Sequence, residues 1–170
     1  MISVQDNYNF SSAELKCLSA ISQIENDLSY KTYEALNAIY KKNGAITLVD
    51  TVKRELVWTV FLTDYPPTEH GALYERSLLR VAPSYRGRGY GRVLLDALID
   101  MHQDKFLISV TSSKPTQHMN DSLGLHMYTA NDAPDLLRKL MNIDSASPLH
   151  PTHKYYVNKP LLKLLTSKSM

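Results

Sequence analysis

The segment from Leu79 to Gly91, LRVAPSYRGRGYG, constrains the fold of this chain more than any other segment. A run of strand-forming residues ends at Val81, and Pro83 stops it because proline has no N–H to donate to a neighbouring strand. Apolar residues recur at helical spacing after the segment. Between the two lie three glycines at alternate positions, namely Gly87, Gly89 and Gly91. The sequence therefore predicts a strand, a glycine turn and a helix in immediate succession.

The predicted turn is suited to bind an anion. Glycine tolerates positive φ angles, so the turn can leave consecutive main-chain N–H groups without partners in the chain. Such N–H groups, together with the positive end of a helix dipole, form a cradle for phosphate oxygens. Three arginines add positive charge to the same segment, namely Arg86, Arg88 and Arg92. We therefore expect this turn to bind a pyrophosphate.

Two common nucleotide-binding motifs do not fit the turn. The P-loop of nucleoside triphosphatases requires GxxxxGK[ST], which the sequence lacks. The dinucleotide-binding fingerprint requires GxGxxG, whereas the spacing here is GxGxG with basic residues inside the turn. The pyrophosphate ligand must therefore be of another kind.

The sequence before the turn predicts two helices and a hairpin. Ser11 and Glu14 have the spacing of a capping box, and apolar residues at helical spacing follow them. A second helical stretch covers residues 29–42. The runs 45–50 and 55–62 are rich in β-branched and aromatic residues and flank a short connection, which is typical of a β-hairpin.

The glycine turn lies inside a predicted βαβ unit. Residues 72–81 form its first strand, residues 89–101 its helix and residues 106–111 its second strand. The two strands of such a unit are parallel, whereas strands joined by hairpins are antiparallel. We therefore predict an α/β (α+β) fold with a mixed, mostly antiparallel sheet flanked by helices.

The pattern after residue 111 is less regular. Residues 115–128 predict a short irregular helix, and the Asp-Ala-Pro at 132–134 is typical of a helix start. A last strand is predicted over 154–157, followed by a tail that is helical or frayed over 160–169.

Length and composition narrow the class of protein. The chain has 170 residues, of which 44% are hydrophobic and 21% charged, which is typical of one globular domain over residues 1–170. We find neither an apolar run long enough to cross a membrane nor a signal-peptide pattern, so we expect no membrane association and a cytoplasmic location. Cys17 is the single cysteine, which excludes an intramolecular disulfide and a multi-cysteine zinc site, and we expect no metal.

Charge is distributed unevenly along the chain. Residues 1–75 have a net charge of −4 and residues 76–170 a net charge of +6, so the second part suits an anionic ligand better. The alternative interpretation is that surface charge varies along any chain, so that this difference has no functional meaning. The basic residues are not interleaved with aromatic ones, and we therefore expect no nucleic acid as a partner.

The residues of the turn resemble the motif of a known family. The stretch VAPSYRGRGYG at 81–91 is similar to V-x-P-x-x-[RQ]-G-x-G-x-[GA], the acetyl-CoA-binding motif of the GNAT superfamily of N-acetyltransferases. The resemblance covers about residues 75–102, and the predicted order of helices and strands around this segment also agrees with a GNAT-like fold.

The resemblance implies how acetyl-CoA, the co-substrate, is bound. Main-chain N–H groups of the turn and of the first helical turn would hold the CoA pyrophosphate. The pantetheine arm would bond to backbone groups of Leu79 and Val81 like an added strand, in the gap where the two parallel strands separate. The residues that would contact the pyrophosphate are Arg86, Gly87, Arg88, Gly89, Tyr90, Gly91 and Arg92.

Transfer of the acetyl group requires that an ammonium loses a proton, and Glu75 is the first candidate for the catalytic base. Glu75 lies six residues before Val81 and on the same face of the predicted strand. The resemblance implies the same role, because histone-acetylating members of the family have a catalytic Glu at this position. A purely structural ion pair with Arg76 or Arg80 is the alternative, and Glu69 and His70 on the preceding loop are further candidate bases.

Tyr128 is the candidate acid that would support the departing CoA thiolate. Many family members have N-x-x-A-x-x-x-Y on the helix after the second parallel strand, and Tyr128 matches the tyrosine. Asp121 and Gly124 stand where the family has Asn and Ala, and the usual trailing Gly-Phe is missing, so Tyr128 acting only as a packing residue is the alternative. The resemblance also implies that the N–H of Val81 stabilises the oxyanion.

These observations favour an enzyme that transfers an acetyl group from acetyl-CoA to a primary amine of a small molecule or protein. The degraded motif around Tyr128 leaves a non-catalytic acyl-CoA-binding or regulatory module with a GNAT fold as the alternative. The acidic first part of the chain, which in the family surrounds the acceptor, favours a cationic amine. Dimers are common in the family, so a homodimer is a possible assembly.

Overall fold

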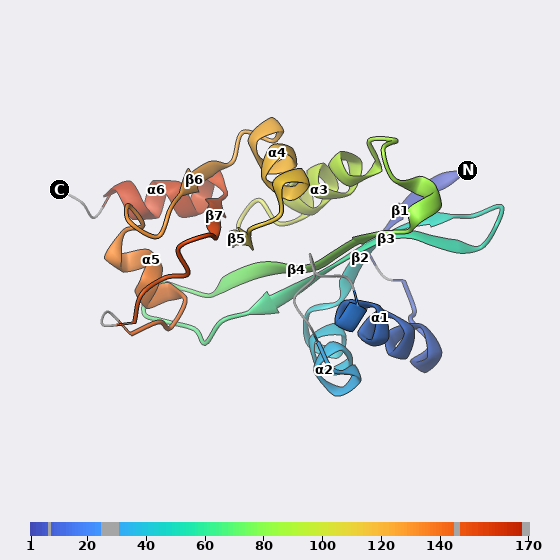
Figure 1. Cartoon of the computed structure of the whole chain (residues 1–170). Coiled ribbons are helices and arrows are strands. Elements are labelled where there is room, and N and C mark those ends of the chain that lie inside the picture. Colours follow the sequence, from blue (N-terminus) through green and yellow to red (C-terminus); the bar gives the residue numbers. More distant parts are fainter. Residues whose placement is uncertain (7, 25–30, 145–146, 168–170) are drawn as a thin grey trace. The chain divides into compact units, whose positions relative to one another are not determined.

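The structure is a computed structural model that describes residues 1–6, 8–24, 31–144 and 147–167. The chain divides into two compact units (Figure 1). The first unit contains Met1–Thr63 and Ser77–Leu98, and the second contains Asp64–Arg76 and Ile99–Met170. Each unit is described separately below. The prediction of one domain over residues 1–170 stays a prediction.

The strands of the first unit are antiparallel neighbours. They are β1 (Ile2–Gln5), β2 (Ala45–Asp50) and β3 (Glu55–Asp64), in the spatial order β1-β2-β3. The second half of β4 (Leu73–Val81) follows β3, and the bond from Ala82 N–H to the Val57 carbonyl (2.8 Å) belongs to this neighbouring pair. The predicted hairpin of β2 and β3 is confirmed, whereas β1 was not predicted because four residues give too short a pattern.

Three helices cover the strands of the first unit. The helices α1 (Ser12–Ile24) and α2 (Tyr33–Asn43) lie on one face of β2 and β3, and α3 (Tyr90–Met101) lies on the other (Figure 1). The capping box at the start of α1 is present, because Ser11 N–H donates to the Glu14 carboxylate (2.8 Å) and Glu14 N–H donates to the Ser11 hydroxyl (3.2 Å). The apolar cluster under α1 and α2 consists of Phe10, Leu15, Leu18, Leu36, Ala45 and Phe61.

The second unit has a mixed sheet in the order β4-β5-β7-β6. The first half of β4 pairs in parallel with β5 (Phe106–Thr111), as the predicted βαβ unit requires. Strand β7 (Lys154–Val157) is antiparallel to β5 and to β6 (His126–Tyr128). One parallel pairing beside several antiparallel ones confirms the predicted fold class.

The helices of the second unit are α4 (Lys114–Ser122), α5 (Asp135–Leu140) and α6 (Lys159–Ser167). The prediction of one irregular helix over 115–128 is wrong in its second half, because the chain leaves α4 at Ser122 and forms β6. Gly124, with φ +67°, lies between the two elements. The apolar cluster of this unit is built from Leu73, Ile108, Leu137, Leu140, Met141, Leu149, Tyr155, Val157, Leu161 and Leu165.

Across the residues described, every helix is too short or too polar to cross a membrane.

Candidate active site

The glycine turn of the first unit has the backbone conformation that its sequence predicts. A 3-10 turn, η1 (Pro83–Tyr85), follows β4, and α3 begins at Tyr90. Gly87 and Gly89 have φ angles of +75° and +77°, and beyond the adjacent residues of the chain no atom lies within 4 Å of the position that a Cβ would occupy at either glycine. A side chain at these positions is therefore disfavoured by the backbone conformation rather than by lack of space.

The turn presents consecutive N–H groups that no other residue in the described part of the chain uses. The N–H of Arg86 donates to the Pro83 carbonyl (3.2 Å), and the N–H of Arg92 donates to the Gly89 carbonyl (3.1 Å). Between them, the N–H groups from Gly87 to Gly91 make no hydrogen bond to any residue that the structure describes. Because two of these groups also begin α3, the positive end of its dipole adds to their attraction for an anion.

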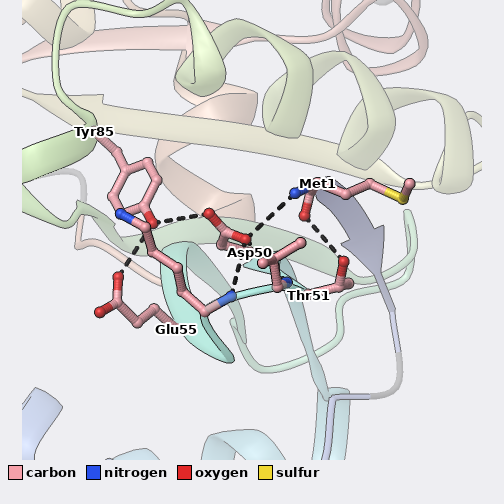
Figure 2. Close-up of polar contacts among 7 residues, drawn as sticks. Met1, Asp50, Thr51, Glu55 and Tyr85 are labelled. Carbon is pink, nitrogen blue, oxygen red and sulfur yellow. Dashed lines mark hydrogen bonds and ion pairs between the residues drawn. The ribbon is translucent and has the colours of Figure 1, made fainter.

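Tyr85 connects the turn to the β2–β3 hairpin within the first unit. Its buried hydroxyl lies 3.1 Å from a carboxylate oxygen of Asp50 and 3.1 Å from one of Glu55 (Figure 2). Burial and the two carboxylates raise the pKa of Tyr85 to about 12, so the hydroxyl keeps its proton. The other oxygen of Asp50 accepts N–H bonds from Val52 and Lys53. The sequence analysis did not predict this connection, because Tyr85 and its partners are 30 and 35 residues apart.

Glu75, the candidate base, lies half-buried in the second unit. The hydroxyl of Tyr65 donates a 2.6 Å hydrogen bond to its carboxylate. Burial and the negative charge of Glu75 raise the pKa of Tyr65 well above the ordinary value, so this phenol stays a donor. Of the two alternative ion pairs of Glu75, the one with Arg76 is wrong, because Arg76 bonds to Asn120 instead, whereas the one with Arg80 stays open.

The two further candidate bases lie on the turn before β4. Nε2 of His70 lies 3.2 Å from a carboxylate oxygen of Glu69, and the Glu69 side chain is 84% exposed. Glu75, by contrast, is half-buried and accepts a hydrogen bond from Tyr65.

Tyr128, the candidate acid, lies on β6 and not on the helix where the resemblance implied it. The helix after β5 is α4, and its sequence KPTQHMNDS contains no tyrosine. The strand register aligns Glu75 with Ile108, Ile108 with Val157, and Val157 with His126, two residues before Tyr128. Since neighbouring strands are about 4.8 Å apart, roughly 14 Å separates the backbones of β4 and β6.

A free thiol and a metal site are the other chemistries to consider. Cys17 on α1 is exposed, because it falls between the inward-facing Leu15 and Leu18. Among the residues that are described, no group of three or more His, Cys, Asp or Glu side chains is placed to hold a metal ion.

A strand, a positive-φ glycine turn and a helix in succession define a class of proteins that bind phosphate groups at the start of a helix. The sequence matches the acetyltransferase (GNAT) family over residues 17–124, which is more than half of the chain, and the chain belongs to this family. It is therefore an acetyltransferase by family. No curated protein matches its sequence.

Solved structures with low sequence identity have a similar fold. One is N-acetylglutamate synthase from Neisseria gonorrhoeae, solved with coenzyme A and N-acetyl-glutamate (16% identity, TM-score 0.65). The match covers 93% of this chain but 35% of the synthase, so the chain spans about a third of that protein. A second is Ard1 from Thermoplasma volcanium (14% identity, TM-score 0.60), where the match covers 92% of this chain and 95% of Ard1. A third is mosquito arylalkylamine N-acetyltransferase like 5b (14% identity, TM-score 0.62), where the match covers 93% of this chain and 99% of that protein.

Proposed function

We propose that the chain acetylates a primary amine of a small molecule or protein and that the glycine turn holds the diphosphate of acetyl-CoA. The run of unused N–H groups from Gly87 to Gly91 is the observation on which this proposal rests. These groups match the donors that a diphosphate needs, and the neighbouring arginines Arg86, Arg88 and Arg92 supply positive charge.

The strand before the turn would bind the pantetheine arm. Main-chain groups of Leu79 and Val81 would bond to its amides, as in an added strand. The carbonyl of Val81 already accepts a hydrogen bond from the Arg86 side chain (3.3 Å), which fixes the direction of this part of the backbone. The N–H of Val81 is the proposed donor to the oxyanion of the tetrahedral intermediate.

Glu75 would act as the base. An alkyl ammonium with a pKa of about 10.4 is mostly unreactive at neutral pH, so the acceptor must lose a proton before or during attack. The hydrogen bond from Tyr65 orients the carboxylate of Glu75, which would accept this proton directly or through one water. The role of Tyr128 at the leaving thiolate stays a prediction, and the position of β6 gives it little support.

The acceptor would be a cationic amine, because residues 1–75 have a net charge of −4. The structural relatives have different acceptors according to their names, since one is a synthase of an acetylated amino acid and another an arylalkylamine acetyltransferase. The fold alone therefore does not select one acceptor. A homodimer and the absence of nucleic acid among the partners stay predictions.

Calorimetry with CoA tests the proposed binding site. Gly89→Ala forces a side chain onto a residue with φ +77°, and its Cβ would project from the anion-binding turn. We expect the Kd for CoA to rise at least tenfold. Gly44→Ala is the matched control, because Gly44 has φ +71° and open space around it but lies at the end of α2. Equal affinity of the parent and Gly89→Ala would overturn the proposal.

A thiol-release assay with a panel of amines tests the reaction. Mono- and diamines should release CoA faster than neutral or acidic acceptors of the same length. CoA binding without release on any amine would instead favour a non-catalytic acyl-CoA-binding module.

A further inference from the structure

Two cations, Lys53 and Arg88, lie over one tyrosine ring in the first unit and are called the cation pair below. The ammonium of Lys53 is 5.6 Å from the centre of the Tyr85 ring, and the guanidinium carbon of Arg88 is 5.8 Å from it. Both side chains are exposed, and in the described part of the chain neither donates a hydrogen bond or forms an ion pair with a carboxylate. Two like charges at one ring, within reach of solvent, attract an anion that the chain itself does not supply.

The ring under the cation pair is fixed by the contacts of its hydroxyl. The Tyr85 hydroxyl lies 3.1 Å from a carboxylate oxygen of Asp50 and 3.1 Å from one of Glu55 (Figure 2). Because its pKa is raised to about 12, the phenol stays neutral, and its ring faces keep the negative potential that attracts cations. The carboxylates therefore contact the hydroxyl end of the ring, while the cation pair lies over the ring itself.

The other arginines of the turn have partners of their own. The Nε of Arg86 donates to the Val81 carbonyl (3.3 Å), and the Nε of Arg92 lies 3.6 Å from a carboxylate oxygen of Asp96. Arg88 belongs to the glycine run whose N–H groups are unused in the described part of the chain, while its side chain extends over the ring. The run of N–H groups and the cation pair are therefore two adjacent anion-binding features.

A ligand that uses both features needs two phosphate positions a short distance apart. CoA has such positions, because its adenosine ribose carries the diphosphate on the 5′ oxygen and a phosphate monoester on the 3′ oxygen. A monoester has a second pKa of about 6, so it carries nearly two negative charges at neutral pH. Lysine offers a compact charge and arginine a planar pair of donors, and both bind phosphate oxygens in proteins. The 3′-phosphate is therefore the group of CoA that suits the cation pair.

We propose that Lys53 and Arg88 bind the 3′-phosphate of CoA and thereby select CoA over acyl donors that lack this group; the inference rests on the proposed function. Lys53 is the new member of the site, because it lies on the connection between β2 and β3, outside the glycine motif. The cation pair, Tyr85 and the glycine turn all belong to the first unit. Donors without a 3′-phosphate, such as an acyl group on the pantetheine phosphate of a carrier protein, bind more weakly.

Calorimetry with CoA and dephospho-CoA tests this inference, because the two ligands differ only in the 3′-phosphate. We expect the Kd for dephospho-CoA to exceed the Kd for CoA at least about tenfold at low ionic strength. Each exposed ion pair contributes a factor of up to about five, and two such pairs act together here. In about 0.5 M salt the ratio of the two Kd values should shrink, since salt screens exposed charges.

Variants of two lysines make the test specific. Lys53→Met should lower the ratio about fivefold, mainly by raising the Kd for CoA, whereas Lys53→Arg keeps a cation and should retain most of the ratio. Lys16→Met is the matched control. Lys16 is also an exposed lysine of the first unit with its ammonium 5.5 Å from the centre of a tyrosine ring, but this ring belongs to Tyr33 of α2 rather than to the glycine turn. Its ratio should follow that of the parent.

The second cation is tested by Arg88→Met. Because Arg88 also lies in the glycine run, this variant weakens the binding of both ligands, but the ratio of their Kd values should still fall about fivefold. The ratio, rather than either Kd alone, therefore measures the contact with the 3′-phosphate.

The outcomes separate this inference from the proposed function. A parent that binds CoA and dephospho-CoA with equal Kd values overturns the 3′-phosphate assignment alone. A ratio that is unchanged in Lys53→Met or in Arg88→Met also overturns it. A parent that binds neither ligand overturns the proposed function and this inference with it.

Discussion

The hydroxyl of Tyr65 donates a 2.6 Å hydrogen bond to the carboxylate of Glu75 inside the second unit. Tyr65 directly follows β3 and Glu75 lies on β4, so the bond joins the segment after β3 to β4. Tyr155 on β7 belongs to the same surroundings, because the charge of Glu75 also contributes to raising its pKa, after burial. The candidate base is therefore held among phenols that keep their protons, in a half-buried position suited to proton transfer.

Replacing either member of this pair should change the pH profile of kcat in a different way. Glu75→Gln removes the base, and we expect kcat to fall about 100-fold or more. Tyr65→Phe keeps the base but removes a donor that favours the ionised carboxylate, so the acidic limb of the profile should move up by about one pH unit. Steady-state kinetics at saturating amine between pH 5 and 9 measure both effects.

The same kinetics with Glu69→Gln test the alternative base. If Glu69→Gln loses turnover and Glu75→Gln does not, the base is on the loop before β4 and the assignment of Glu75 is wrong.

Tyr128→Phe tests whether Tyr128 supports the leaving thiolate. We expect kcat of Tyr128→Phe to stay within about twofold of the parent, because β6 lies three strands from β4 at about 4.8 Å each. Burial and the charge of Asp132 also raise the pKa of Tyr128, which makes it a weaker acid than an ordinary phenol. A tenfold fall in kcat, with an unchanged KM for acetyl-CoA, would assign the role to Tyr128 instead.

Local patterns in the sequence predicted the elements that position the proposed CoA site. Strand β5 has the predicted bounds, Phe106–Thr111, because a short apolar run between polar segments shows where the strand begins and ends. The glycine turn was predicted because glycines at alternate positions after a strand indicate a backbone with positive φ angles. The φ angles of Gly87 and Gly89 agree with this prediction.

Contacts between distant residues were not predictable in this way. Arg76 and Asn120 are 44 residues apart, and no pattern in either segment indicates that they meet. Tyr128 was placed on a helix because family spacing was extended past Gly124, where the chain ends α4 and forms a three-residue strand. Strands as short as β1 and β6 depend on their partners rather than on their own periodicity.

Tyr85→Phe should weaken CoA binding through the conformation of the turn. The lost hydroxyl no longer connects the turn to Asp50 and Glu55, and we expect the Kd for CoA to rise about tenfold, as for a lost hydrogen bond to a charged group (Figure 2). Tyr33→Phe is the matched control. A lysine lies over the ring of Tyr33, as one does over Tyr85, but the Tyr33 hydroxyl bonds to no residue in the described part of the chain. Calorimetry with both variants measures the difference, and equal affinities would contradict this role.

The stability contribution of the Tyr85 hydroxyl should disappear in alkali. The pKa of Tyr85 is raised from 10.0 to about 12 in the folded chain, so the folded state retains the proton longer than the unfolded state. The contribution is therefore complete below pH 10 and is lost as the pH rises to about 12. The difference in unfolding free energy between the parent and Tyr85→Phe should shrink over this interval, and a constant difference would contradict the argument.

The capping box of α1 should make stability sensitive to acid. Burial disfavours the charged form of Glu14, but hydrogen bonds from Tyr8 and Ser11 outweigh it and lower the pKa below its ordinary value of 4.5. A lowered pKa means that the stabilisation is present above pH 4.5 and is lost as the pH falls further. Ser11→Ala should lower the unfolding free energy by about 1 kcal/mol at pH 7 and by less at pH 3. Thermal unfolding at both pH values measures this, with the exposed Ser12→Ala as control, and an equal loss at pH 7 and pH 3 would refute the linkage.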